Sequence, residues 1–419
     1  MNSLLPTLID ETFTALNQLG NCVERHCDFP LADDVIKVAI GMRRVGKTYF
    51  LYQTINQLLD GGVAEEQILL INFEDDRLLP MTAKEMGALL DDFYTLYPEN
   101  HDRCCYLFLD EVQNVPDWHL VVRRFFDSKN VQLYLTGSSA KLLSKEIASS
   151  LRGRSLATEI WPYDFSEFLS ANDRTLPNKP LSKRDYDFLQ ENLLNYFILG
   201  GFPGVQDLIE REWRATLQTY VDTVILRDII ERYNVSNIKL LKYLTNTLLK
   251  NAATKFSINK FYNDVKSQGH KIGKDTLHNY MEYLEDAFLV FTVPFYAESE
   301  RVKQNRTKKI YAIDTGLINA MALSVNDLYN KCFENLIYLD LRRAGKQVYY
   351  YETKAGYEVD FVAVSSDGTR ELIQVTWDMS DATTAEREQR ALDSAEAELG
   401  LKGRIITPQA YLAALVERG

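Results

Sequence analysis

GMRRVGKT, from Gly41 to Thr48, is the stretch that decides the fold. It fits the pattern G-x-x-x-x-G-K-[ST], follows the apolar run Val35–Ile40 and precedes the helical run YFLYQTINQLL at 49–59. Glycines at both ends of the pattern let the backbone curl, so that successive N–H groups face phosphate oxygens at the positive end of the next helix. The stretch therefore predicts a phosphate-binding loop between a strand and a helix of an α/β domain.

The side chains of this loop predict a site for ATP and Mg²⁺. Lys47 is expected to bridge the β- and γ-phosphates, and the Thr48 hydroxyl is expected to ligate Mg²⁺. The residues around them should also contact the nucleotide. The predicted nucleotide-binding residues of the loop and the first helical turn are Gly41, Arg43, Arg44, Val45, Gly46, Lys47, Thr48 and Tyr49.

A second element, CCYLFLDE at 104–111, places two carboxylates at the end of a buried strand and resembles a Walker B motif. Asp110 is expected to hold the magnesium ion through its water shell. Glu111 is expected to orient and polarise the attacking water, which makes it the predicted catalytic carboxylate.

Two further segments carry weaker signals. The run Val131–Thr136 is followed by Gly137, Ser138 and Ser139, so a serine hydroxyl, with Ser138 as the candidate, could contact the γ-phosphate; an ordinary strand-to-helix turn is the alternative. LRGRS at 151–155 contributes Arg152 and Arg154. Arg154 is the candidate for stabilising the transition state, either within the chain or from a neighbouring subunit, and a solvated surface pair is the alternative.

The order of elements predicts a parallel sheet followed by other domains. Residues 33–165 alternate apolar β-rich runs with amphipathic stretches, as in a βα fold. The predicted strands are Val35–Ile40, Gln67–Phe73, Cys104–Leu109, Val131–Thr136 and Leu156–Trp161. The C-terminal region reads αβββαβ: a helix at Phe333–Arg343, strands at Gln347–Glu352, Glu358–Val364 and Glu371–Thr376, a helix at Thr383–Leu399 and a strand at Arg404–Thr407.

Six segments together resemble a prokaryotic AAA-like ATPase family: GMRRVGKT, INFEDDRLL, LFLDEVQNVPDW, LTGSSAKLLSKE, LRGRS with WPYDFSEFL, and YFILGGFPGV. The resemblance extends from about Asp34 to Thr407. It implies an additional-strand P-loop core with the Walker A strand in mid-sheet, and a position for Glu74 near the phosphates. It also implies a C-terminal half that combines a winged helix with a restriction-endonuclease-like domain.

The expected domains are therefore an N-terminal helical segment at 1–32, an AAA-like ATPase core at 33–182, a helical connector at 183–235, a winged-helix-like domain at 236–312 and a nuclease-like domain at 313–419.

Charge sets the winged-helix-like segment apart. The whole chain has a net charge of −12, yet residues 236–312 carry thirteen Lys and Arg against seven Asp and Glu, a local net charge of +6. An apolar stripe with helical spacing, which includes Leu277 and Met281, should leave Lys274, His278 and Asn279 facing outward as contacts for duplex DNA.

The wing of this domain should hold the phosphate contacts Arg306, Lys308 and Lys309. Glu282 and Glu285 oppose DNA binding, because they lie on the same helix as the predicted groove contacts. Many winged helices bind only protein, so a protein partner is the alternative.

In the last domain, GYEVDFV and LIQVTW resemble the PD-(D/E)xK nuclease core. Glu334 and Asp360 fall where metal ligands are expected, with Glu358 as an extra carboxylate on the face of Asp360. Gln374 replaces the second-strand acid, and Thr376 stands at the position of the nuclease lysine. These departures predict a degenerate scaffold, with Lys354 in the preceding loop as the residue that could supply the missing cation.

Composition excludes other classes. The longest apolar runs are far shorter than the roughly 20 residues that span a bilayer, and the start MNSLLPTLIDE does not read as a secretory signal. Five cysteines in 419 residues indicate a reducing, cytoplasmic setting. Cys22, His26 and Cys27 have no second ligand pair at useful spacing, so no metal is expected there.

The predicted function is an ATPase that couples nucleotide turnover to binding of DNA or a partner. The alternatives are a signal-transduction-type nucleotide switch that binds a protein, and an ATP-gated, metal-dependent DNA nuclease. The oligomeric state stays open.

Overall fold

The chain forms two compact units in a computed structural model, which describes residues 4–20, 22–138, 151, 153–269, 272–322, 328–379 and 382–418. Unit 1 is Met1–Ile160 and unit 2 is Trp161–Gly419. Sequence alone predicts the first core to end at residue 182, whereas residues 161–182 belong to unit 2. The N-terminal helix is part of unit 1 and packs against its sheet and its third helix.

Unit 1 is an α/β domain with a five-stranded parallel sheet in the order β2-β3-β4-β1-β5. Its elements are α1 Leu5–Gln18, β1 Ile36–Ile40, α2 Lys47–Asp60, β2 Ile68–Asn72, α3 Ala83–Leu96, β3 Cys105–Asp110, α4 Trp118–Ser128, β4 Val131–Gly137 and β5 Ser155–Glu159. The strand that leads into the phosphate loop, β1, lies inside the sheet, and β4 separates it from β3. The predicted additional-strand P-loop fold is confirmed.

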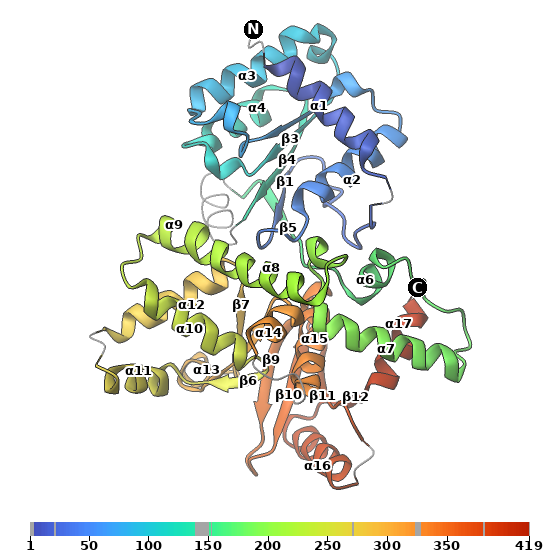
Figure 1. The fold of residues 1–419 in the computed structure, drawn as a ribbon, viewed down its shortest axis with the longest axis vertical. Helices are drawn as coiled ribbons and strands as arrows, with labels where there is room; N and C mark the ends of the chain where they lie inside the picture. The colour runs from blue at the N-terminus through green and yellow to red at the C-terminus, as the bar shows by residue number, and fades with distance from the viewer. Residues whose placement is uncertain are drawn as a thin grey trace. The chain divides into compact units, whose positions relative to one another are not determined.

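Four of the five strands of unit 1, β1 to β4, are largely apolar because both faces of the sheet are covered there, whereas no residue of the edge strand β5 is buried. Every residue of β1 is buried, and so are five of the six residues of β3. Figure 1 shows α2 on one side of the sheet and α3 and α4 on the other. Strands that lie between two helical layers have no solvated face, so these four strands read as apolar runs.

Unit 2 begins with helices and contains two further sheets. Its elements are α6 Phe165–Ala171, α7 Lys183–Leu199, α8 Glu210–Thr223, a π-helical stretch at Val224–Ile230, α9 Glu231–Tyr233, α10 Ile238–Lys250, β6 Thr254–Phe256, α11 Ile258–Ser267, α12 Lys274–Asp286, β7 Val290–Val293, α13 Glu300–Asn305, β8 Lys308–Ala312, α14 Thr315–Met321, α15 Tyr329–Arg343, β9 Gln347–Glu352, β10 Glu358–Val364, β11 Arg370–Val375, α16 Ala382–Leu399, β12 Gly403–Ile406 and α17 Pro408–Arg418.

The two sheets of unit 2 have the orders β6-β8-β7 and β12-β11-β10-β9. The first is antiparallel, and the second joins antiparallel β9, β10 and β11 to a parallel β12. The predicted order αβββαβ is confirmed as α15, β9, β10, β11, α16 and β12. Within the described parts of both units, no helix is long and apolar enough to cross a membrane.

A buried carboxylate, Asp314, joins the turn after α7 to the start of α14. One of its oxygens accepts a hydrogen bond from the Gly201 N–H at 2.6 Å, and the other accepts one from the Leu317 N–H at 3.2 Å. Burial raises the pKa of Asp314 to about 6. Gly200 has a φ of 75°, and a Cβ there would lie 2.0 Å from the Asp314 carboxylate, so only glycine fits.

Candidate functional site

The phosphate loop follows β1 at the carboxyl edge of the sheet. A Cβ on Gly41 would lie 2.2 Å from the Ile160 carbonyl oxygen, so a side chain cannot fit there without moving the backbone. Gly46 has a φ of 96° and precedes the first turn of α2. Both glycines of the motif are therefore required by the geometry of the loop.

Lys47 lies at the centre of this loop. Its ammonium donates hydrogen bonds to the Gly41 and Met42 carbonyl oxygens at 3.2 and 3.3 Å. It also forms an ion pair of 3.2 Å with Glu111, and both side chains are almost fully buried. The loop thus holds a cation where phosphate oxygens would arrive.

Two threonine hydroxyls hold the carboxylate of Asp110, at the end of β3. Thr48 donates to one oxygen of Asp110 at 2.8 Å, and the fully buried Thr136 donates to the other. The same Thr136 oxygen accepts a hydrogen bond from the Glu111 N–H at 2.8 Å. Sequence reasoning missed Thr136 and favoured Ser138, which is buried directly after β4.

The electrostatics of the two carboxylates differ. Burial alone would raise the pKa of Glu111, but the Lys47 ammonium and a hydrogen bond from Gln113 outweigh burial, and the pKa is lowered. For Asp110, burial and the neighbouring Glu111 raise the pKa. Glu111 is therefore the carboxylate that is held ionised beside the loop cation.

Glu74 also lies against the loop. Its carboxylate pairs with the Arg43 guanidinium at 2.6 Å, which agrees with the position that the family resemblance implies. Arg44 and Tyr49 are exposed, and Arg44 has a φ of 70°.

A buried arginine from the segment before β1 supports the loop. The Arg25 guanidinium donates to the Val45 carbonyl oxygen at 2.9 Å. The Arg25 backbone exchanges two hydrogen bonds with the side-chain amide of Gln53 on α2. Sequence reasoning missed Arg25, since neither its spacing nor its neighbours carry a recognisable motif.

The predicted role of Arg154 within its own chain is wrong. The Arg154 carbonyl oxygen accepts a hydrogen bond from the N–H of Ile36, the first residue of β1, and its guanidinium pairs with Asp127. Because β1 and β5 are parallel, Arg154 lies at the amino edge of the sheet, opposite the phosphate loop. A role for Arg154 in a neighbouring subunit stays a prediction. Arg152 and Ser139 lie outside the described residues.

The loop and β3 together offer oxygen ligands that suit Mg²⁺. The Thr48 hydroxyl and the Asp110 carboxylate are adjacent, as their 2.8 Å hydrogen bond shows. Hydroxyl and carboxylate oxygens are the ligand types that this hard cation prefers, with water completing the shell. These two residues fit the ion that an ATP site requires.

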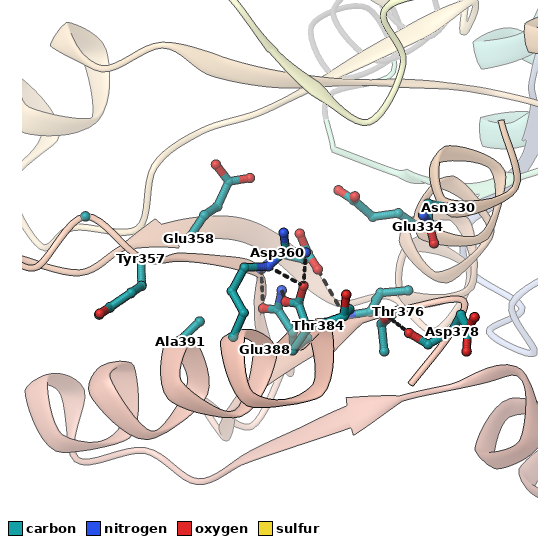
Figure 2. Close-up of a pocket in the computed structure, with 14 residues that line it drawn as sticks. Asn330, Glu334, Tyr357, Glu358, Asp360, Thr376, Asp378, Thr384, Glu388 and Ala391 are labelled. Carbon is teal, nitrogen blue, oxygen red and sulfur yellow. Dashed lines mark hydrogen bonds and ion pairs between the residues drawn. The ribbon is translucent and has the colours of Figure 1, made fainter. Parts of the chain in front are cut away.

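A second candidate site is a cavity of about 520 Å³ in unit 2. Figure 2 shows Glu334, from α15, together with Glu358 and Asp360, from β10, around this cavity. Gln374, the expected substitute for an acid, turns its amide oxygen to the Asp360 N–H and its amide nitrogen to Glu388. Glu388 on α16 is a buried acid that sequence reasoning missed.

Lys309 corrects two predictions. It was expected on the exposed wing as a DNA contact, but it is buried and its ammonium lies 2.6 Å from Glu334, 2.9 Å from Glu358 and 3.1 Å from Asp360. It also supplies the cation expected to be missing, whereas Lys354 is exposed and does not line the cavity.

The three carboxylates and Lys309 shift one another's pKa values. Burial and the neighbouring Asp360 raise the pKa of Glu334 to about 7. Burial alone would lower the pKa of Lys309, but the carboxylates, led by Glu334, raise it well above its ordinary value. The Lys309 ammonium is therefore held in its charged form.

The other predicted DNA contacts lie on the surface of unit 2. Lys274, His278 and Asn279 are exposed on α12, and Arg306 and Lys308 are exposed at the start of β8. Glu285 accepts hydrogen bonds from the Thr292 N–H and hydroxyl at 2.9 and 2.6 Å, so it is turned toward β7. One of the two acids that oppose DNA binding is therefore engaged elsewhere.

Comparisons with protein families match nearly the whole chain. Residues 33–169 match a family described as an AAA domain. Residues 190–328 and 329–413 match two families described as domains of unknown function, DUF8612 and DUF4143.

Two relatives resemble the chain over most of its length. The uncharacterized protein MJ1544 of Methanocaldococcus jannaschii is 37% identical over 385 residues, which cover 90% of this chain and 82% of the relative. An uncharacterized protein of Haemophilus influenzae is 29% identical over 351 residues, covering 84% of each chain.

Among solved structures, the Walker-type ATPase PABY2304 of Pyrococcus abyssi is similar with a TM-score of 0.43 at 17% identity, covering 74% of this chain and 94% of that one. The Aeropyrum pernix ORC1 protein in complex with DNA has a TM-score of 0.32 at 12% identity, covering 76% and 90%.

Proposed function

The chain belongs to one family with the uncharacterized protein MJ1544 of Methanocaldococcus jannaschii, and we propose that it is an ATP hydrolase whose turnover is coupled to binding of duplex DNA. The observation that carries the ATPase is the meeting of four side chains at one edge of the parallel sheet. Lys47 contacts Glu111, and Thr48 contacts Asp110, although the two members of each pair lie about sixty positions apart in the sequence.

Each of these residues has a role in the proposed reaction. Lys47 leaves the loop carbonyl oxygens and Glu111 to bind the β- and γ-phosphates. Thr48 and Asp110 are the residues that would hold Mg²⁺, which neutralises phosphate charge when bound. Glu111 then orients the attacking water and accepts its proton. Thr136 fixes Asp110 and the Glu111 backbone relative to each other.

Coupling to DNA rests on unit 2. Lys274, His278 and Asn279 share an exposed helix surface on α12, which an element entering the major groove requires. Arg306 and Lys308 extend the positive charge toward β8. This arrangement supports duplex DNA as the partner, and a protein partner is the competing outcome of the test.

Lys308→Glu should weaken duplex binding for all sequences alike, because a phosphate contact carries no base information. The salt dependence of binding should also become shallower by about one unit of log–log slope. The measurement is a fluorescence-anisotropy titration at several salt concentrations, with ATP turnover followed in parallel with and without the duplex.

Lys84→Glu, at an exposed position of α3 in unit 1, makes the same charge change outside the proposed surface and should leave DNA binding intact. If both variants weakened DNA binding equally, the loss of affinity would be due to the net charge of the protein and not to a contact made by Lys308. DNA binding that survives both Lys308→Glu and high salt would contradict this proposal, and so would an ATP turnover rate that DNA does not change. Either result would favour a protein as the partner of this surface.

We also expect no efficient DNA cleavage by the cavity of unit 2. Gln374 contributes oxygen without charge, and Lys309 already occupies the three acids that would bind a metal ion. Mg²⁺ gives up its water reluctantly and needs a strongly anionic site. The test incubates supercoiled plasmid with the protein and Mg²⁺ or Mn²⁺, with and without ATP. Nicking that disappears in Asp360→Ala would establish an ATP-gated nuclease instead.

A further inference from the structure

Two lysines lie directly opposite each other in the small sheet of unit 2. Lys255 on β6 and Lys309 on β8 are partners in the antiparallel register. Like charges in such a pair repel each other and destabilise a sheet. Their side chains must therefore meet negative charge, which the neighbouring strands β9 and β10 and helix α15 provide.

Lys309 has every one of its donors in use. An ammonium group carries three N–H donors, and the three carboxylates of Glu334, Glu358 and Asp360 lie within 3.1 Å of it. The Lys309 side chain is only 2% exposed, so water does not compete for these contacts. The second oxygen of Asp360 accepts from the Val375 N–H at 3.0 Å.

Lys255 completes the arrangement from the other strand. Its ammonium lies 2.7 Å from Glu352 and 2.7 Å from the second oxygen of Glu358. Glu358 therefore bridges the two lysines, with one oxygen on each. Together the lysines bring two positive charges, the charge of one divalent cation.

These residues do not fit the divalent ion that the nuclease-like order of elements implies. One oxygen of each of the three carboxylates that would ligate it already faces Lys309, which enters from a different sheet. Gln374 is turned to Asp360 and Glu388, so it does not complete a metal shell. An ion could enter only if Lys309 left, and that move would strand a buried ammonium.

We propose that Lys309, assisted by Lys255, is a built-in counter-ion that takes the place of a divalent cation among Glu334, Glu358 and Asp360. The cluster stores no metal ion in the native chain. Its lysines instead tie the β6-β8-β7 sheet to strand β10 and helix α15. Removal of the Lys309 ammonium should uncover a cation site that the native chain keeps closed.

The test measures Mn²⁺ binding by electron paramagnetic resonance on the full chain without nucleotide. Lys309→Ala should bind one more Mn²⁺ per chain than the native protein. The melting temperature of Lys309→Ala should fall in EDTA and recover in Mn²⁺. The melting temperature of the native protein should not depend on a metal ion bound among these three carboxylates. Lys308→Ala, on the same strand with an exposed side chain, is the matched control and should have the Mn²⁺ stoichiometry and the response of melting temperature to EDTA and Mn²⁺ of the native protein.

A second substitution locates the gained ion. Asp360→Asn in the Lys309→Ala background should abolish the additional Mn²⁺ binding. In the native background, Asp360→Asn should leave the Mn²⁺ stoichiometry unchanged. This comparison tests the proposal even if Lys309→Ala does not fold. Native Mn²⁺ binding that depends on Asp360, or a folded Lys309→Ala that gains no ion, would overturn the proposal.

Discussion

Glu111→Gln will slow ATP hydrolysis by about 10²- to 10⁴-fold, the range expected when a group that accepts a proton in the transition state is removed. ATP binding will be retained, because the amide is close in size to the carboxylate and the phosphate contacts come from the loop and Lys47. The assay measures phosphate release at saturating ATP, together with binding of a fluorescent ATP analogue.

Lys47→Ala is the matched loop variant, and it should lose nucleotide binding itself. Its ammonium is the positive charge placed within the loop, held by the Gly41 and Met42 carbonyl oxygens. The contrast between the two variants separates phosphate binding from water activation. Undiminished turnover by Glu111→Gln would assign the catalytic carboxylate elsewhere.

Asp314→Ala should destabilise unit 2 by roughly 2–5 kcal/mol, because two buried backbone N–H groups lose a charged acceptor. Three of the chain's four tryptophans, Trp161, Trp213 and Trp377, lie in unit 2, so tryptophan fluorescence during urea unfolding reports mainly on this unit. Asp367→Ala is the control, since this carboxylate also accepts a backbone N–H but lies in an exposed turn. Equal losses in both variants would contradict the importance of burial.

The pH dependence provides a second test of Asp314. Its pKa is about 6 in the folded chain, above the ordinary value of 3.8, so the folded state binds the proton more tightly. This group therefore favours folding at low pH, and that contribution is lost as the pH rises through about 6. The stability of the native chain relative to Asp314→Asn should fall across this interval.

The parallel sheet could be predicted because four of its five strands, β1 to β4, are buried on both faces. All but one of the predicted strand ends in unit 1 lie within one residue of the observed ends. The motifs around Lys47 and Asp110 fix which ends of the strands meet, since parallel strands bring their carboxyl ends to one edge. The same rule argues against a catalytic role for Arg154 within its own chain. Arg154 directly precedes a strand, so it must lie at the amino edge of the sheet, opposite the phosphate loop.

The position of Lys309 could not be predicted from its neighbours. Lys308 and Lys309 are consecutive residues at the start of one strand, and alternation requires only that they face opposite ways. Which of them is buried depends on acids of α15 and β10, more than twenty residues further along the chain. Arg25 was missed for a similar reason, because its partner is a carbonyl oxygen that only the folded loop presents.

The lysine pair also bears on how related chains can diverge. Loss of Lys309 alone would leave three carboxylates facing one another, so it should persist in a lineage only where an acid is lost too or a metal ion is gained. Lys308 has no such restriction, because its side chain is exposed and its ammonium donates to the neutral Thr292 hydroxyl at 3.4 Å. Two adjacent lysines that look equivalent in the printed sequence should therefore have different substitution histories.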